Sequence, residues 1–185
     1  LIINGENRVN ISILTHMASA LAMNQFSSLT AANISHANSQ VANLFKINHT
    51  LPQLTSVSLS HSLSSTNRSH GAIRAALFNA AIFAAINLKG GDLLQRNISA
   101  FSEQFGQNGG QLPLTSSDIT TISLHHILQQ AHHIILQLEN PTADSIQNQS
   151  LDLGTISSEL RNELNASLQA SGNATTTSLA SPAAA

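Results

Sequence analysis

The chain of 185 residues contains no cysteine, tryptophan or tyrosine, and only 9% of its residues are charged. Without cysteine there is no disulfide framework, no thiolate metal site and no cysteine nucleophile. The lysines and arginines are scattered and the formal net charge is −2, which excludes the clustered cations that nucleic acid binding needs. The longest apolar run, residues 80–86, is far short of the roughly 20 residues of a membrane span. We therefore expect no transmembrane helix, no signal peptide and no nucleic acid partner.

Uncharged polar residues take the surface positions that charged residues usually hold, since soluble domains average about 25% charged residues. Asn-X-Ser/Thr occurs eight times, where chance predicts roughly four. Composition bias is one explanation, and N-linked glycosylation is the other. Asn97 falls within a predicted helix, where it could be buried. The remaining predicted acceptors are Asn10, Asn33, Asn48, Asn67, Asn148, Asn165 and Asn173.

Apolar residues recur at three- and four-residue spacing along most of the chain, which predicts helices. Asn10, Asp92 and Ser117 are the expected N-caps of three of them. Residues 71–88 are apolar on nearly all sides, as is typical of a central, buried helix. The expected helices span residues 10–28, 33–46, 71–88, 92–105, 118–139 and 155–171.

These helices predict an all-α fold, a bundle of five to six helices in a single domain over residues 1–170. Residues 171–185, with the sequence SGNATTTSLASPAAA, predict a flexible low-complexity tail.

A short segment, SVSLSHSLSS at residues 56–65, alternates serine with apolar residues as a strand does. A lone strand cannot satisfy its backbone without a partner. The segment therefore predicts either an extended surface stretch or an edge that pairs with another molecule. The residues of this predicted assembly edge are Val57, Leu59, His61 and Leu63.

Four histidines occur as two pairs in HHILQQAHH, at His125, His126, His132 and His133. Seven residues separate equivalent members, about 10.5 Å along a helix, so no two of them chelate one ion as an i, i+4 pair does. A solvated or interface face is the simplest interpretation. The alternatives are a metal or haem site completed by other histidines, and a pH switch, since nine histidines can move the formal charge from −2 to +7.

Two stretches, AALFNAAIFAA at residues 75–85 and LTAANISHANSQVANLF at residues 29–45, resemble the repeat domains of aciniform and tubuliform spider-silk proteins. The regions around them also echo each other at a separation of 56 residues, Leu21 with Leu77 and Phe45 with Phe101. The resemblance covers about 45 residues and implies an extracellular helical bundle that polymerises. It carries no catalytic residues.

No nucleophile elbow, phosphate-binding loop or carboxylate pair in a pocket pattern is present, so we expect neither an enzyme nor a cofactor. The sequence predicts an extracellular structural protein that assembles with copies of itself into a fibre, filament or coat and carries N-linked glycans. The alternative is a helix-bundle binding module that holds a metal, haem or lipid through its histidines.

Overall fold

The computed structural model describes residues 11–54, 57, 59, 69–87, 94–116, 121–139 and 151–170. Within these residues the chain is all-helical and has no strand, which confirms the predicted all-α bundle. The helices are α1 (Ile13–Gln25), α2 (Ala31–Leu44), α3 (His70–Asn87), α4 (Leu94–Gln107), α5 (Leu124–Glu139) and α6 (Leu151–Ala170), with one turn of 3₁₀ helix, η1 (Leu51–Gln53).

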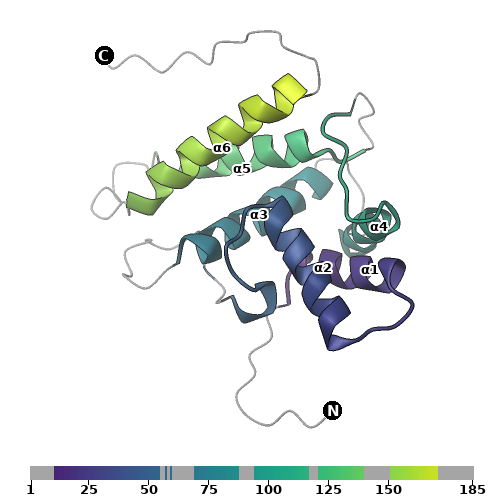
Figure 1. The fold of residues 1–185 in the computed structure, drawn as a ribbon. Helices are drawn as coiled ribbons and strands as arrows, with labels where there is room; N and C mark the ends of the chain where they lie inside the picture. Colours follow the sequence, from purple (N-terminus) through teal and green to yellow (C-terminus); the bar gives the residue numbers. More distant parts are fainter. Residues whose placement is uncertain are drawn as a thin grey trace, which may run out of the picture.

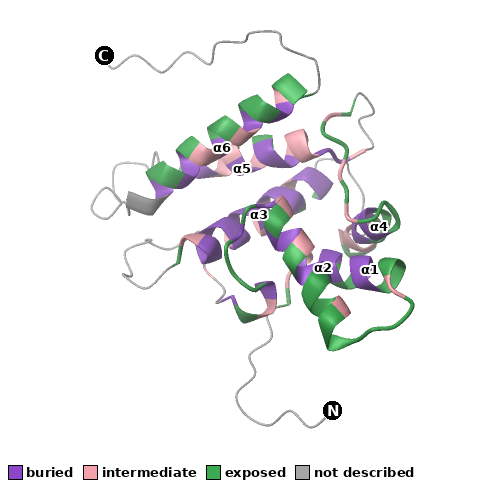
Figure 2. Ribbon diagram, viewed as in Figure 1, coloured by how far each residue is buried: buried purple, intermediate pink, exposed green. Residues whose placement is uncertain are grey.

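The helix α3 lies between two groups of helices (Figure 1). On one side α1 packs against both α2 and α4, and on the other side α5 packs against α3 and carries α6. Buried residues from all six helices form one hydrophobic core. Figure 2 shows α3 buried along most of its length, whereas α6 exposes its outer face. The predicted central helix is therefore confirmed over residues 71–87, and Leu88 lies outside the described residues.

Serine and threonine hydroxyls begin four of the helices by accepting a hydrogen bond from a backbone N–H, which is the usual role of an N-cap. Ser12 accepts from Thr15 N, and the Thr15 side chain accepts from Ser12 N, which completes a capping box. Thr30, Ser69 and Ser123 accept from Asn33, Ala72 and His126 respectively. Three serines and one threonine of this chain therefore serve to start helices.

The predicted start of α1 was wrong, because Ser12 rather than Asn10 provides its cap. The helix α5 begins at Leu124, six residues later than predicted. The cause is the preceding loop: Leu124 N and His125 N donate to the carbonyls of Pro113 and Leu114, and Ser123 caps the helix. The proposed cap Ser117 lies outside the described residues, as does Asp92.

The helix α6 begins at Leu151, four residues earlier than predicted. Gly154 does not end or start it, since Leu153 is buried in the core and continues the apolar stripe of Ile156 and Leu160. The helix α2 stops at Leu44, before Pro52, which lies in η1.

Candidate functional site

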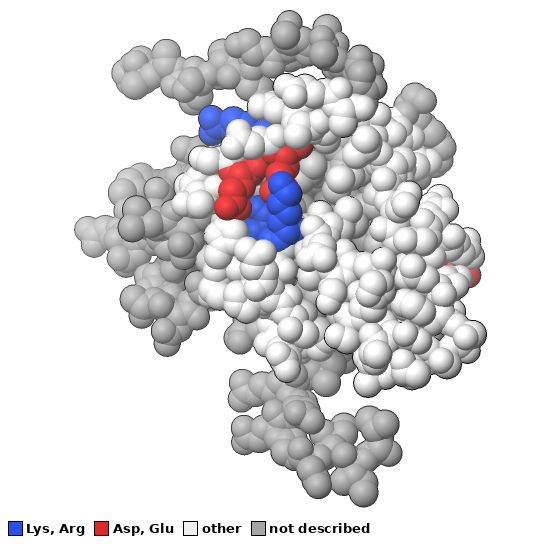
Figure 3. Space-filling model, in the orientation of Figure 1, with Lys and Arg blue, Asp and Glu red and all other residues white. Residues whose placement is uncertain are grey.

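Four of the few charged side chains meet at one place, between the end of α2, the first turn of α3 and the middle of α6. We call Lys46, Arg74, Glu159 and Glu163 the charged cluster. Arg74 is fully buried, and its guanidinium donates to Glu159 Oε2 at 2.9 Å and to Glu163 at 2.9 and 3.1 Å. Figure 3 shows that the charges of this face are gathered in this region, while the rest of its described surface is largely uncharged.

Arg74 also donates hydrogen bonds to the backbone at the C-terminal end of α2. Its Nε and Nη2 donate to the Phe45 carbonyl at 3.2 and 3.0 Å, one of the carbonyls that a helix C-terminus leaves without an intrahelical partner. A cation here is favoured by the partial negative charge of the helix end. The guanidinium also lies 5.3 Å from the centre of the Phe78 ring, within cation–π range. A single arginine therefore joins α2, α3 and α6.

The backbone at the end of α2 brings Lys46 into the cluster. Lys46 N donates to Asn43 O and Ile47 N donates to Ala42 O, the pattern of a Schellman turn. Lys46 takes the left-handed position with φ of 50°, where glycine is usual. Its Nζ then lies 3.4 Å from Glu163 Oε1.

A polar cavity of about 660 Å³ opens beside the charged cluster. Its walls include His70, whose Nε2 lies 3.1 Å from Glu159 Oε2, and three asparagines, Asn43, Asn48 and Asn162. Both carboxylates face cations. The geometry indicates a structural junction that holds α6 against the bundle.

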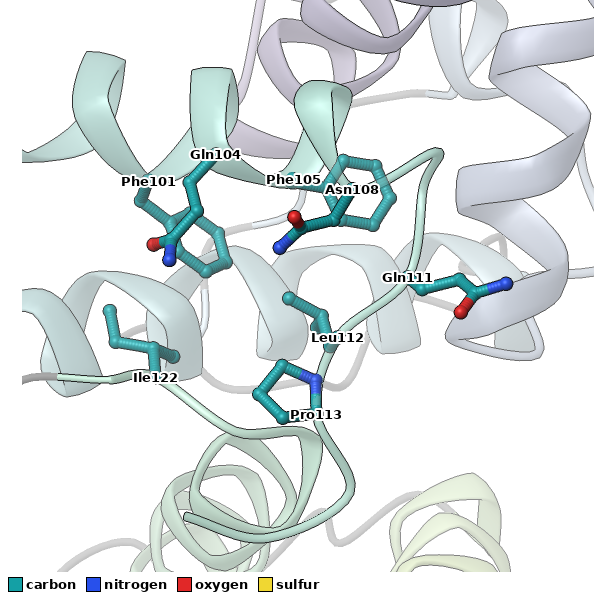
Figure 4. Close-up of a pocket in the computed structure, with 8 residues that line it drawn as sticks. All are labelled: Phe101, Gln104, Phe105, Asn108, Gln111, Leu112, Pro113 and Ile122. Carbon is teal, nitrogen blue, oxygen red and sulfur yellow. The ribbon is translucent and has the colours of Figure 1, made fainter. Parts of the chain in front are cut away.

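A second hollow, of about 400 Å³, lies between α4 and the loop that leads to α5. Its floor is apolar, and the carboxamides of Gln104, Asn108 and Gln111 lie at its rim (Figure 4). In Figure 4 Gln104 and Asn108 lie beside Phe101 and Phe105 on α4, opposite Leu112 and Pro113, whereas the Gln111 carboxamide points away from them. The floor residues are Phe101, Phe105, Leu112, Pro113 and Ile122. Among the described residues that line this hollow, none is charged.

The four histidines of α5 do not gather into a metal site. His133 is exposed and bonds Gln137 at 3.0 Å, whereas His125, His126 and His132 are half-buried. In the described part of the chain, no three His, Asp or Glu residues come close enough to hold one ion. The metal hypothesis thus gains no support from the residues that the structure describes.

His125 instead links α5 to α6, because its Nδ1 lies 2.9 Å from the hydroxyl of Ser167. The Ser167 hydroxyl donates to the Leu164 carbonyl at 2.7 Å, so the imidazole N–H is the donor to Ser167. Ser167 is buried and its proton is committed, so it is not an activated nucleophile. Burial, with a smaller contribution from His126, lowers the pKa of His125 from its ordinary value.

This lowered pKa predicts an acid-sensitive stability. The unfolded chain binds the proton at the ordinary value of about 6.5 and the folded chain only below it. The contribution of neutral His125 to the free energy of unfolding is therefore complete above about pH 6.5 and is lost as the pH falls through the lowered pKa. Denaturant unfolding at pH 7.5 and pH 5 should show a smaller loss of stability in His125→Gln than in the unmodified chain. His133→Gln, on the same helix but exposed, is the control; if it changed the pH dependence as much as His125→Gln, the assignment to His125 would be wrong.

The predicted glycan acceptors differ in exposure. Asn48 and Asn165 are exposed, whereas Asn33 is half-buried in the first turn of α2 and donates to the Ser28 carbonyl. Asn97 is half-buried on α4. Asn10, Asn67, Asn148 and Asn173 lie outside the described residues. Asn48 and Asn165 are therefore the described acceptors best placed for modification.

The predicted assembly edge is described only at Val57 and Leu59. Both are half-buried, and Val57 packs against the hydrophobic core. His61 and Leu63 lie outside the described residues. Val57 therefore contributes to the hydrophobic core of its own chain.

Reading the sequence alone missed the charged cluster, although two signals for it are present. Arg74 is the one charged residue in the otherwise apolar stretch 71–88, where an arginine needs a buried partner. Glu159 and Glu163 are four residues apart, which places them on one face of a helix. The sequence does not show that the face of α3 with Arg74 packs against the face of α6 with the two glutamates.

None of the helices in the described part is both long and apolar enough to cross a membrane. Comparisons with protein-family models, with curated proteins and with solved structures found no match. The resemblance to spider-silk repeat domains therefore stays a prediction.

Proposed function

We propose that this protein is a self-assembling structural subunit, and that copies meet through the hairpin formed by α1 and α2. The observation that carries this proposal is the absence of charge from the hairpin. No Asp, Glu, Lys or Arg occurs between Arg8 and Lys46. Two such surfaces can meet without burying a charge, which is the costly step in forming an interface.

The hairpin also exposes apolar side chains. Of the six large hydrophobic residues that are exposed in the described part of the chain, four lie within or directly before it. They are Ile11, Met23, Leu29 and Ile34, with exposed fractions of 92%, 60%, 58% and 43%. Exposed large apolar side chains concentrated in one hairpin favour that hairpin as a protein interaction site.

We further propose an extracellular location for the assembled protein, with N-linked glycans at Asn48 and Asn165. Both asparagines lie outside the hairpin, so sugars on them would hydrate the weakly charged surface without covering the proposed interface. The acceptor pattern occurs eight times in the sequence, where chance predicts roughly four, and this excess supports the glycan proposal.

Charge placed on the hairpin should prevent assembly. We expect the full chain to sediment as particles larger than 19.5 kDa, and the double variant Leu29→Glu with Ile34→Glu to sediment as a monomer. The matched control, Ser158→Glu with Gln169→Glu, adds the same charge at exposed positions of α6 and should still assemble. Circular dichroism establishes that each variant remains helical.

A chain that stays monomeric at every concentration would overturn the assembly proposal. Intact mass before and after enzymatic removal of N-linked glycans, measured on protein from a secretory host, tests the glycan proposal separately. A bare mass of 19.5 kDa would overturn it. An unglycosylated monomer would favour the alternative, a binding module. The histidines of α5 are dispersed and give no support to a metal site in such a module.

A further inference from the structure

The hollow beside α4, which is lined by both apolar side chains and carboxamides, carries an inference independent of assembly. We propose that it binds the C-terminal segment of the same chain, residues 171–185, in an extended form, with Leu179 seated on the apolar floor. The pocket would then be a peptide-binding site whose resident ligand is the chain's own tail.

The position at which α6 ends favours this occupant. Ser167, in the last turn of α6, bonds His125 in the first turn of α5, and Ile122 in the wall of the hollow precedes His125 by three residues. Figure 1 shows the end of α6 beside the start of α5. The tail therefore leaves the bundle close to the mouth of the hollow.

The length of the tail is sufficient to reach the floor. Leu179 follows Ala170, the last residue of α6, by nine residues. At about 3.3 Å per extended residue, these nine residues span up to about 30 Å. The whole segment of 15 residues spans up to about 50 Å.

The chemistry of the tail also matches that of the hollow. The tail has no charged side chain, and none of the described residues that line the hollow is charged, so no described side-chain charge has to lose its water on binding. Leu179 is the one large apolar residue of the segment, and five of the eight described residues that line the hollow are apolar (Figure 4).

Carboxamides suit an extended peptide because each one offers both donors and an acceptor to backbone groups. In the described part of the chain, Gln104 and Asn108 are exposed, and their carboxamides make no hydrogen bond to a described residue. The run Thr175–Thr177 favours extended backbone, and Pro182 restricts the residue before it in the same way. The tail thus offers backbone N–H and C=O groups where the hollow offers carboxamides.

Disulfide trapping in the full chain tests this proposal without interference, since the chain has no cysteine of its own. The test variant combines Ser178→Cys, which leaves Leu179 in place, with Gln104→Cys at the rim. The control variant combines Ser178→Cys with Asn165→Cys, an exposed position on α6 that is closer to the tail along the chain. If the tail did not dock, the cysteine at position 178 would meet the nearer cysteine at position 165 more often, so the control pair would form its disulfide faster.

We expect the Gln104 pair to form an intramolecular disulfide about tenfold faster than the Asn165 pair, because docking raises the local concentration of the two thiols. Adding Leu179→Ser should abolish this difference. Equal rates, or a rate unaffected by Leu179→Ser, would overturn the proposal. Disulfide-linked dimers in place of monomers would overturn it as well, since they would place the tail in the hollow of another copy. Gln111→Cys repeats the test if Gln104→Cys disturbs α4.

Discussion

Replacing Arg74 by methionine is expected to lower the free energy of unfolding by about 3–5 kcal/mol, the usual cost of removing one partner from a buried ion pair. The loss is large because Glu163, whose side chain is only 11% exposed, is left buried without its main partner. The Phe45 carbonyl also loses two donors. Domains of this kind have a total stability of about 5–15 kcal/mol, so the variant should approach the limit of folding.

Denaturant unfolding followed by circular dichroism measures this loss. Arg161→Met is the matched control, because Arg161 is exposed on α6 and its replacement should change stability by about 0.5 kcal/mol or less. Adding Glu159→Gln and Glu163→Gln to Arg74→Met should recover part of the stability, since the abandoned charges are then removed. If Arg74→Met were no more harmful than Arg161→Met, the charged cluster would not hold α6 to the bundle.

Replacing Gly106 by alanine is expected to cost about 1–3 kcal/mol through overpacking, although alanine is favoured over glycine in a helix by about 1 kcal/mol. Gly106 lies on α4 where that helix crosses α1. A methyl group there would meet the Ala20 carbonyl oxygen at 2.6 Å and Asn24 Nδ2 at 2.8 Å. The first of these is backbone, so relief requires the two helices to separate.

The chain offers a control with the same chemical change. Gly154 lies in α6, is exposed, and has no atom within 4 Å of an added Cβ. Gly154→Ala should therefore stabilise the protein by up to about 1 kcal/mol. Thermal unfolding of both variants should show shifts of opposite sign, and two shifts of the same sign would contradict the close approach of α1 and α4.

The sequence by itself determined which segments are helical. Apolar spacing located all six helices, and the apolar composition of residues 71–88 identified the central one, because local periodicity and burial follow from residue type. Helix starts were less certain. Asn10 and Ser12 are both capping residues, and the choice between them depends on which hydroxyl or amide reaches the first N–H groups of α1.

Only the tertiary structure decided which helix faces meet. Arg74 lies 85 residues from Glu159 and 89 from Glu163, and His125 lies 42 residues from Ser167. No local pattern encodes these pairings, because each depends on how α3, α5 and α6 pack. The start of α5 was decided in the same way, by the loop carbonyls of Pro113 and Leu114. Spacing along the chain fixes the face on which a side chain lies, and packing of the whole core fixes what that face meets.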